Sequence, residues 1–359
     1  MKLTTKNSIK NHIRLEHGGK FSISSPNSIL IDFSTNVNPL GISPKLSKYL
    51  KKNLDKISDY PDVNSTKLLE ELENHLKISK NNIIIGNGAI EIIYNFCNAF
   101  LSKKKILIPS PTFGEYEIAT NLIESKQEFF KTLDLSVDYK KFLKRIPTNG
   151  CVFICNPNNP TGTILSKNQM LEIIKYAKNK SSLVFVDECF IELVPNGDES
   201  IISYAKKFDN LLVLRSFTKS FGLAGIRVGY AVSSKPIIDI LKKLQIPWSV
   251  NSVAQNAALI SLKDKTFLKK TNSLIKNEIK FLEKSINKIP NFSCQKSTTN
   301  FILIKTNINS TLLQKKLVEK KILVRDCKNF RGLDDHFIRI AVKTHKDNVK
   351  LVSILENLK

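Results

Sequence analysis

Lys219 stands in a local sequence whose residue types suit covalent chemistry with a carbonyl compound. The segment SFTKSFGLAGIRVGY, residues 216 to 230, places this lysine between two hydroxyl residues, with glycines and Arg227 after it. A lysine amine at the rim of a crevice forms a Schiff base with a bound carbonyl group. The neighbouring hydroxyls and Arg227 would suit a phosphate. The alternative is one more solvated charge among the 49 lysines of the chain.

Three other segments place polar residues directly after short apolar runs. VFVDECF reaches Asp187, a carboxylate that caps a helix, forms a salt bridge or, in an enzyme, faces a cationic heterocycle. NPNNPTG offers Asn158 and Asn159, which either cap a turn or donate amide hydrogen bonds into a site. GNGA, residues 86 to 89, is either a tight turn or a helix start whose free amides bind phosphate. It is not a dinucleotide fingerprint, because Glu91 replaces the third glycine.

The elements that would position these residues alternate between strand-like and helical patterns from about residue 67 to 265. Such alternation is typical of parallel βα units. The apolar runs lie in NNIIIG, KKILIPS, GCVFICNP, SSLVFVDE and NLLVLRS, and RVGYAVSS predicts one further strand, antiparallel to its neighbours. Their almost continuous apolar character favours an α/β fold in which helices cover both faces of a mostly parallel sheet. A ligand site is then expected beyond the carboxyl ends of the strands.

The last ninety or so residues have a different pattern. A long lysine-rich amphipathic helix at about 265 to 288 precedes a strand pair in FSCQKSTTNFILIKT, a helix, KKILVRD, HFIRIAVK and a closing helix. This order predicts a second, smaller α+β domain. We therefore expect a large domain over 41–265 and a small domain formed by 1–40 together with 266–359. The first forty residues show no clear helix and are expected to pack against the small domain.

Composition and charge indicate an ordinary globular protein. The 359 residues are 42% hydrophobic and 25% charged, long enough for one large domain or two unequal ones. MKLTTKNSIKN lacks the apolar core of a secretory signal, and no run of about 18 apolar residues predicts a membrane span. We therefore expect a cytoplasmic protein with no membrane partner.

The formal net charge of +24 raises the question of a nucleic-acid partner. Nucleic-acid binding requires basic residues clustered on one face with aromatic residues between them. Here the lysines are spread through every segment, which favours a solvated surface and no nucleic-acid partner. The six cysteines form no CxxC pair and the five histidines no HExxH motif, so neither a metal site nor disulfides are predicted.

Taken together, NPNNPTG, VFVDE, SFTKSFGLAGIRVGY and HFIRIAV resemble the fold type I enzymes that use pyridoxal 5′-phosphate, the aspartate aminotransferase superfamily. The resemblance extends over nearly the whole chain. It implies a three-layer αβα large domain, a smaller α+β domain and a homodimer. It also implies that Lys219 binds the cofactor covalently and moves protons once substrate has displaced it.

The same resemblance assigns further contacts with the cofactor. Asp187 would pair with the protonated pyridine nitrogen, Asn159 would donate to the phenolic oxygen of the ring, and Phe113 would stack on the ring face. The cofactor phosphate would be held by Gly88, Ala89, Ser216, Arg227 and, across the dimer interface, Tyr60. Arg339 would bind the carboxylate of the substrate.

Within the superfamily, EHGGKF, DFSTNVNPLG, DECFIEL and VRDCKNFRGL resemble the threonine-phosphate decarboxylases of cobalamin side-chain synthesis, whose nearest relatives are the histidinol-phosphate aminotransferases. This likeness implies a small phosphorylated amino acid as substrate, with Arg325 binding its phosphate. The residues implied to line the substrate site are His17, Gly18, Asn36, Asn159, Arg325 and Arg339. The sequence alone favours a capping or surface role for His17, and Lys20 stands where asparagine is frequent in this group.

Phe190 bears on the choice between decarboxylation and transamination. Many aminotransferases of the histidinol-phosphate type carry tyrosine at this position, where its hydroxyl reaches the phenolic oxygen of the cofactor. The phenylalanine favours L-threonine O-3-phosphate decarboxylase, although a simple packing role also fits. The alternative is an aminotransferase acting on histidinol phosphate or on a phosphonate such as 2-aminoethylphosphonate.

Overall fold

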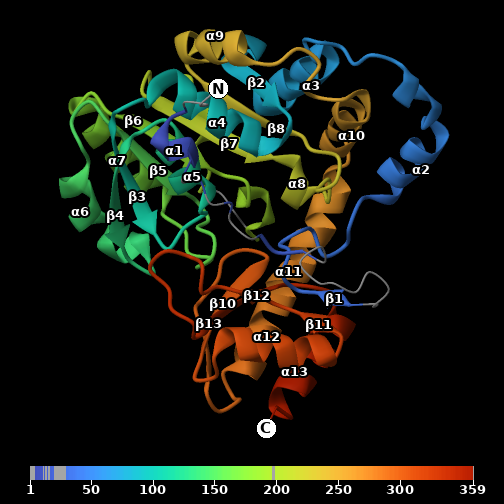
Figure 1. Ribbon diagram of the computed structural model, residues 1–359. Helices are drawn as coiled ribbons and strands as arrows, with labels where there is room; N and C mark the ends of the chain where they lie inside the picture. Colours follow the sequence, from blue (N-terminus) through green and yellow to red (C-terminus); the bar gives the residue numbers. More distant parts are fainter. Residues whose placement is uncertain are drawn as a thin grey trace, which may run out of the picture.

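The computed structural model describes residues 5–10, 12, 14, 17–19, 30–195 and 199–358 of the chain (Figure 1). Its larger sheet has seven strands in the order β2-β8-β7-β6-β5-β3-β4. In that order the strands are β2 (Ile83–Gly86), β8 (Gly229–Ser233), β7 (Leu211–Ser216), β6 (Leu183–Asp187), β5 (Cys151–Cys155), β3 (Lys105–Ser110) and β4 (Lys126–Lys131). All neighbours are parallel except β8, which is antiparallel to both β2 and β7.

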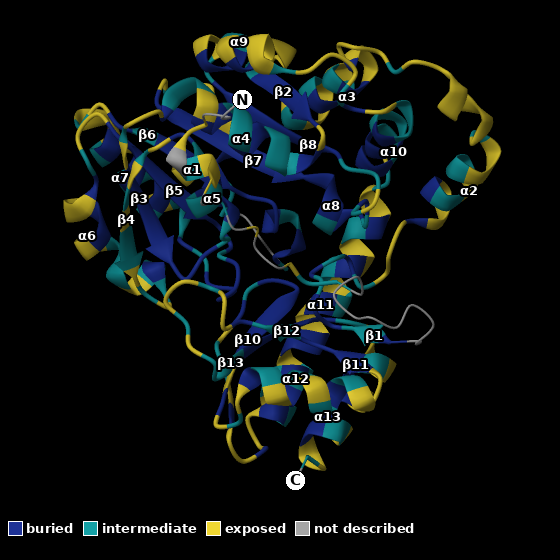
Figure 2. Cartoon of the chain, viewed as in Figure 1, coloured by how far each residue is buried: buried dark blue, intermediate teal, exposed yellow. Residues whose placement is uncertain are grey.

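The central strands bury side chains on both faces because helices cover the sheet from both sides. In β6, Val184 and Val186 belong to one buried cluster, whereas Phe185 between them belongs to another. The Phe185 side is covered by α4 (Gly88–Phe100), α5 (Glu115–Leu122) and α9 (Lys235–Leu244). The opposite side is covered by α2 (Pro44–Lys52), α3 (Thr66–Leu76), α6 (Leu135–Arg145), α7 (Lys167–Asn179) and α10 (Ser252–Leu262). Figure 2 shows these strands dark blue and the outer faces of the helices yellow. The three-layer α/β prediction is confirmed.

Capping residues explain where several helices begin. Ser166 and Gln169 form a reciprocal capping box at the start of α7. Asp264 accepts a hydrogen bond from the backbone at the start of α11 (Lys265–Ile286), and Thr344 does the same for α13 (His345–Glu356). The long helix predicted at about 265 to 288 is therefore confirmed as α11.

A smaller antiparallel sheet lies below the larger one in Figure 1, in the order β12-β13-β10-β9. Its strands are β12 (Arg325–Asp326), β13 (Phe337–Ala341), β10 (Phe301–Thr306) and β9 (Phe292–Cys294), with α11, α12 (Ser310–Glu319) and α13 around it. The pairing of β9 with β10 confirms the strand pair predicted in FSCQKSTTNFILIKT.

Residues near the start of the chain join this smaller unit. β1 (Ile31–Asp32) pairs in parallel with β11 (Ile322–Leu323), although almost 300 residues separate them in the sequence. One prediction was incomplete, because the first forty residues contain a short helix, α1 (Asn7–Lys10). The division into 41–265 and 1–40 with 266–359 stays a proposal. Among the described residues, no helix is both long enough and apolar enough to cross a membrane.

Candidate active site

The carboxyl ends of the large-sheet strands open into a cavity of about 500 Å³. This edge is where a parallel α/β sheet is expected to bind its ligand. Twelve of the residues predicted for the site line the cavity: His17, Gly18, Asn36, Ala89, Phe113, Asn159, Asp187, Ser216, Lys219, Arg227, Arg325 and Arg339. Residues from the larger and the smaller sheet thus meet around one space.

Lys219 lies in α8 (Phe217–Ser220), a single turn that begins directly after β7. Ser216 caps this turn, its hydroxyl accepting from the Thr218 amide at 3.1 Å. Burial lowers the pKa of Lys219 to about 8, and the positive charges of Arg339 and Arg227 act in the same direction. A buried amine that loses its proton this readily is well suited to nucleophilic attack on a carbonyl.

Asp187 ends β6, the strand next to β7. Its Oδ2 accepts from the Tyr116 hydroxyl at 2.6 Å and its Oδ1 from the Cys189 amide at 2.8 Å. Burial raises the pKa of Asp187, while these hydrogen bonds and the Lys219 charge oppose the rise. A carboxylate taken out of water in this way gains most from a cationic partner placed against it.

The start of α4 and Arg227 form a cradle suited to an anion. Gly88 has φ +75°, and a Cβ added there would lie 2.7 Å from Nη2 of Arg227, so only glycine lets the guanidinium lie against this helix start. Arg227 itself has φ 67°, the left-handed region, and donates from Nη1 to the Ala224 carbonyl at 3.1 Å. Free amides at a helix start and an arginine fork are the usual groups that hold a phosphate.

Arg339 and Arg325 enter the cavity from the smaller sheet. They are directly paired across β12 and β13, so their side chains leave the same face of the sheet. Arg339 donates to the Asn159 side-chain oxygen and, at 2.8 Å, to the Ser34 carbonyl, while its buried Nε has no hydrogen-bond partner in the described part of the chain. Burial lowers its pKa to about 10. Two facing cations and an unpaired buried donor indicate a site for an anion.

His17 is held at the mouth of the cavity by a carboxylate. Its Nε2 lies 2.8 Å from Oε1 of Glu115, the first residue of α5, and its ring centroid is 6.1 Å from that of Phe113. The neighbouring Gly18 approaches the Ser34 carbonyl so closely that a Cβ would collide with it. The His17 side chain is 54% exposed, so it lies at the surface beside the cavity, and its role in binding substrate stays a proposal.

Phe190 lies between the cavity and the core. It is buried, packs edge-on against Phe301 with centroids 5.0 Å apart, and has the Lys219 Nζ 5.9 Å from its ring centroid. Its ring therefore forms part of the cavity wall beside the lysine as well as part of the core.

Two predicted site residues, Gly88 and Tyr60, do not line this cavity. Gly88 lies behind it, in contact with Arg227 as described above. Tyr60 is 85% exposed and packs beside Trp248, with ring centroids 5.4 Å apart. Lys20 is outside the described residues.

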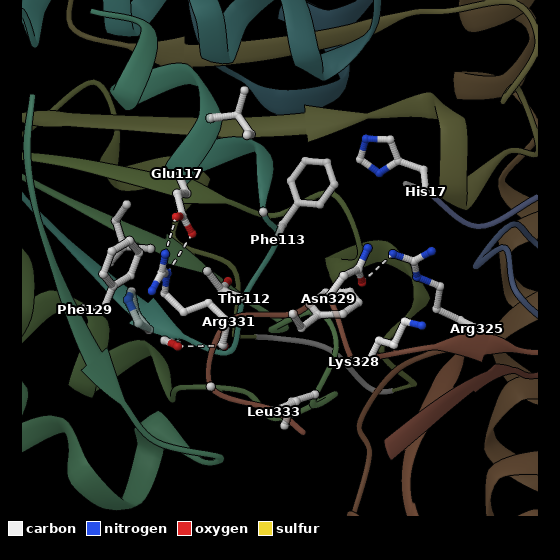
Figure 3. Close-up of a pocket in the computed structure, with 17 residues that line it drawn as sticks. His17, Thr112, Phe113, Glu117, Phe129, Arg325, Lys328, Asn329, Arg331 and Leu333 are labelled. Carbon is white, nitrogen blue, oxygen red and sulfur yellow. Dashed lines mark hydrogen bonds and ion pairs between the residues drawn. The ribbon is translucent and has the colours of Figure 1, made fainter. Parts of the chain in front are cut away.

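A second cavity of about 540 Å³ adjoins the first and shares His17, Phe113, Arg325 and Phe330 with it. Figure 3 shows its far wall, where Arg331 donates to Glu117 from Nε at 2.9 Å and from Nη2 at 2.6 Å. The same guanidinium lies 4.2 Å from the ring centroid of Phe129. This ion pair fastens the loop between β12 and β13 to α5, so the two sheets are joined beside the active site.

Several residues of the site were not anticipated from the sequence. Tyr94, Glu115, Tyr116 and Phe330 all bear on the cavity. Glu115 and Tyr116 closely follow Phe113 in PSPTFGEY, so their nearness in the chain was the one available signal. Tyr94 lies on α4, and the sequence pattern does not specify which neighbouring element this face of the helix packs against.

The donor set fits pyridoxal 5′-phosphate. The cradle of Gly88, Ala89, Ser216 and Arg227 suits its phosphate, the Asp187 carboxylate suits a protonated ring nitrogen, and the Lys219 amine suits its aldehyde. The roles of these residues are proposals that rest on this fit. No described group other than this set combines an anion cradle, a buried carboxylate and a buried amine in one cavity.

Comparison with known proteins gives a consistent answer. The family model for aminotransferase class I and II matches residues 28–355. A protein of Caldanaerobacter subterraneus provisionally named threonine-phosphate decarboxylase is 36% identical over 96% of this chain and 94% of its own. A crystal structure of histidinol-phosphate aminotransferase from Clostridium acetobutylicum superposes with TM-score 0.84 at 35% identity, covering 91% and 98% of the two chains.

A third relative is again named as a decarboxylase. The crystal structure of L-threonine-O-3-phosphate decarboxylase from Porphyromonas gingivalis has TM-score 0.82 at 27% identity, covering 90% of this chain and 98% of that one. The resemblance inferred from the motifs is confirmed, and the relatives divide between a lyase and an aminotransferase. This chain therefore belongs to the aminotransferase class I and II family, as an aminotransferase or decarboxylase whose cofactor is pyridoxal 5′-phosphate.

Proposed function

We propose that this enzyme acts on a small phosphorylated amino acid and that its reaction is the decarboxylation of L-threonine O-3-phosphate. The observation that carries the substrate class is the direct cross-strand pairing of Arg325 with Arg339. Like charges placed opposite each other destabilise a sheet. A substrate with two anionic ends, a phosphate and a carboxylate, relieves that repulsion at both arginines. The relatives named above act on phosphorylated compounds, which supports the same class.

The roles of the residues follow from their positions. Arg325 and His17 bind the phosphate near the mouth, and Arg339 with Asn36 binds the carboxylate deeper in the cavity. Asn159 accepts from Arg339 through its oxygen, which leaves its Nδ2 to donate toward the cofactor. Because Arg339 is fixed by Asn159 and by the Ser34 carbonyl, it holds the carboxylate in one orientation.

That orientation decides the reaction. When bound, the cofactor would supply a conjugated ring that stabilises the electron pair left on the α-carbon when one of its bonds breaks. If Arg339 orients the carboxylate for loss, the carbon–carbon bond would break and carbon dioxide would leave. Lys219 would then deliver a proton to the α-carbon, giving an amino-alcohol phosphate. If Arg339 instead leaves the α-proton facing Lys219, the lysine would remove that proton.

The second candidate is a histidinol-phosphate aminotransferase. It is favoured by the 35% identity and TM-score 0.84 to the Clostridium acetobutylicum enzyme. Against it, Phe190 lacks the hydroxyl that tyrosine would supply at this position of the wall. We place the decarboxylase first for that reason, together with the His17, Gly18 and Asn36 surroundings.

The proposal includes a homodimer and a place in cobalamin side-chain synthesis. Tyr60 and Trp248 form an exposed aromatic pair, and both are large apolar side chains with more than half of their surface open to solvent. Such a pair suits a contact with a second copy, through which Tyr60 would reach the cofactor phosphate of its partner. A cytoplasmic location stays a prediction.

One incubation separates the two reactions. The purified enzyme with cofactor is given threonine O-phosphate, with and without 2-oxoglutarate, and carbon dioxide and glutamate are measured. We expect stoichiometric carbon dioxide without any oxo-acid. Glutamate formed from histidinol phosphate or 2-aminoethylphosphonate, with no carbon dioxide from threonine phosphate, would overturn the decarboxylase in favour of an aminotransferase.

A further inference from the structure

Glu115 links His17 to a tyrosine on the neighbouring helix. Its Oε1 lies 2.8 Å from Nε2 of His17, and its Oε2 accepts from the Tyr94 hydroxyl of α4 at 2.8 Å. Glu115 is only 9% exposed and is the first residue of α5, where the helix dipole favours a negative charge. Both carboxylate oxygens are therefore engaged, and the direction of each hydrogen bond depends on the charge of Glu115.

The charge state of Glu115 follows from its surroundings. Burial raises the pKa of this carboxyl, but the hydrogen bonds from His17 and Tyr94 outweigh that effect and the pKa lies below its usual range. Burial raises the pKa of Tyr94, so its phenol keeps its proton. A carboxylate only accepts hydrogen bonds. The hydrogen between Glu115 and His17 must then sit on Nε2 of the imidazole.

This arrangement constrains the other ring nitrogen. An imidazole that carries its hydrogen on Nε2 has a lone pair on Nδ1 while it is neutral, and it donates from Nδ1 only once it is protonated. Nδ1 makes no hydrogen bond with any residue that the structure describes. Since His17 lines both cavities, Nδ1 is the atom it can offer to a ligand there.

We propose that Glu115, supported by Tyr94, is the positioning residue that makes His17 a proton-dependent phosphate donor. A phosphate oxygen at Nδ1 accepts only from the protonated ring, so phosphate and one proton from solvent bind together. Glu115 holds Nε2–H and offers the negative charge that the resulting imidazolium faces. The proposal rests on the proposed function in one respect, that the ligand carries a phosphate.

The other groups near His17 are consistent with this role. Arg325 shares both cavities with it and supplies a second donor to the same phosphate. The Phe113 ring lies beside it. Among the described residues, Glu115 is the carboxylate within hydrogen-bond distance of the ring.

The tautomer and its change are read directly by nitrogen NMR. Holoenzyme labelled with ¹⁵N-histidine contains five imidazoles, and His17→Gln identifies the one in question. The probe is n-propyl phosphate, which has no amine and cannot react. We expect the ring of His17 to be protonated on Nε2 before the probe is added and on both nitrogens in its presence. A ring that stays neutral when the probe is bound would overturn the proposal.

A double-mutant cycle separates positioning from general structural damage. Glu115→Gln keeps the size of the side chain and removes its charge, and we expect about tenfold weaker binding of n-propyl phosphate at pH 7.5. In a His17→Gln background, Glu115→Gln should weaken the binding of n-propyl phosphate by less than twofold, because Glu115 acts on the phosphate through the imidazole. An equal loss of affinity with and without His17 would refute the coupling between Glu115 and His17. Glu124→Gln, an exposed carboxylate just beyond α5, is the matched control and should bind the probe like the parent.

The pH dependence provides a third measurement. Above about pH 7.5 the probe is a dianion, since the second pKa of a phosphate monoester is near 6. Its affinity for the parent enzyme should fall by up to tenfold per pH unit, whereas His17→Gln and Glu115→Gln should show a flatter profile. Identical profiles in all three would contradict proton uptake at His17. These measurements need no turnover, so a failure to decarboxylate threonine phosphate would count against the proposed function alone.

Discussion

Arg215 and Glu188 form a buried ion pair directly behind the active-site strand ends. Nε and Nη2 of Arg215 lie 3.0 and 2.9 Å from Oε2 of Glu188, and the two side chains are 9% and 0% exposed. Arg215 immediately precedes Ser216, and Glu188 immediately follows Asp187. The pair thus ties the end of β6 to the end of β7 at the points from which Asp187 and Lys219 enter the cavity.

Removing one partner of this pair should be costly. Arg215→Met would leave the Glu188 carboxylate buried and without its cation, and we expect a loss of about 3–5 kcal/mol in the free energy of unfolding. The control is Arg145→Met, which breaks an exposed pair with Glu128 and should cost no more than about 1 kcal/mol. Urea denaturation followed by circular dichroism measures both. Equal losses in the free energy of unfolding for the two variants would show that the buried pair stabilises the fold no more than an exposed one.

Lys219 should be the lysine that captures the cofactor. Burial, Arg339 and Arg227 lower its pKa to about 8, so the neutral amine becomes the main form above that pH. The rate of cofactor capture by the apoprotein should therefore rise with pH and level off above about 8. Borohydride reduction and peptide mapping identify the modified residue. A pyridoxyl group on another lysine, or a rate that keeps rising toward the ordinary lysine value near 10.4, would contradict the assignment.

Lys219→Ala provides the companion measurement. We expect turnover to be abolished, because the nucleophilic amine is absent. Weak binding of the cofactor should persist, since the cradle of Gly88, Ser216 and Arg227 is untouched. Equilibrium dialysis separates these outcomes, and full activity in this variant would exclude a covalent role for the residue.

Tyr116 should support the charge of Asp187. Its hydroxyl donates to Oδ2 at 2.6 Å, and this hydrogen bond opposes the rise in the pKa of Asp187 that burial causes. Tyr116→Phe removes the donor, so that pKa should rise further and more of the carboxyl should be protonated. A protonated carboxyl pairs poorly with a cationic ring, and we expect the cofactor to bind roughly tenfold more weakly.

Equilibrium dialysis of the cofactor checks this, with Tyr176→Phe on the outer helix α7 as the control. The melting temperature of each apoprotein shows whether the fold has changed. Unaltered cofactor affinity in Tyr116→Phe would mean that the Cys189 amide alone is sufficient to support Asp187.

Arg325 and Arg339 should recognise different ends of the substrate. We expect Arg325→Ala to weaken binding of threonine O-phosphate by about 1.5–3 kcal/mol and to leave threonine unaffected. Arg339→Ala should weaken the binding of both compounds, because both carry the carboxylate. Steady-state kinetics with each compound measure these losses of binding. The cofactor absorption spectrum should hardly change in either variant. If Arg325→Ala weakened the binding of threonine and of threonine O-phosphate equally, Arg325 would not bind the phosphate.

Much of this site could be predicted from local sequence. Lys219, Asp187 and Asn159 each follow a short apolar run, and parallel strands bring their carboxyl ends to one edge of a sheet. The order of these runs along the chain was therefore enough to place three chemical groups near one another. The edge strand β4 was not foreseen, because KQEFFK contains four charged or polar residues and only two apolar ones.

The sequence by itself determined six of the seven strands of the larger sheet, the polar residues at their ends and the lysine, because those features depend on periodicity and on neighbours a few residues away. Only the tertiary structure decided that His17 meets Glu115 across 98 positions, that Tyr116 meets Asp187 across 71, and that Arg339 meets Asn159 across 180. The pairing of Arg325 with Arg339 depends likewise on the register of two antiparallel strands. Hydrophobic patterning specifies which face of an element is buried but not which element covers it, so contacts between distant segments are fixed only when the whole core packs.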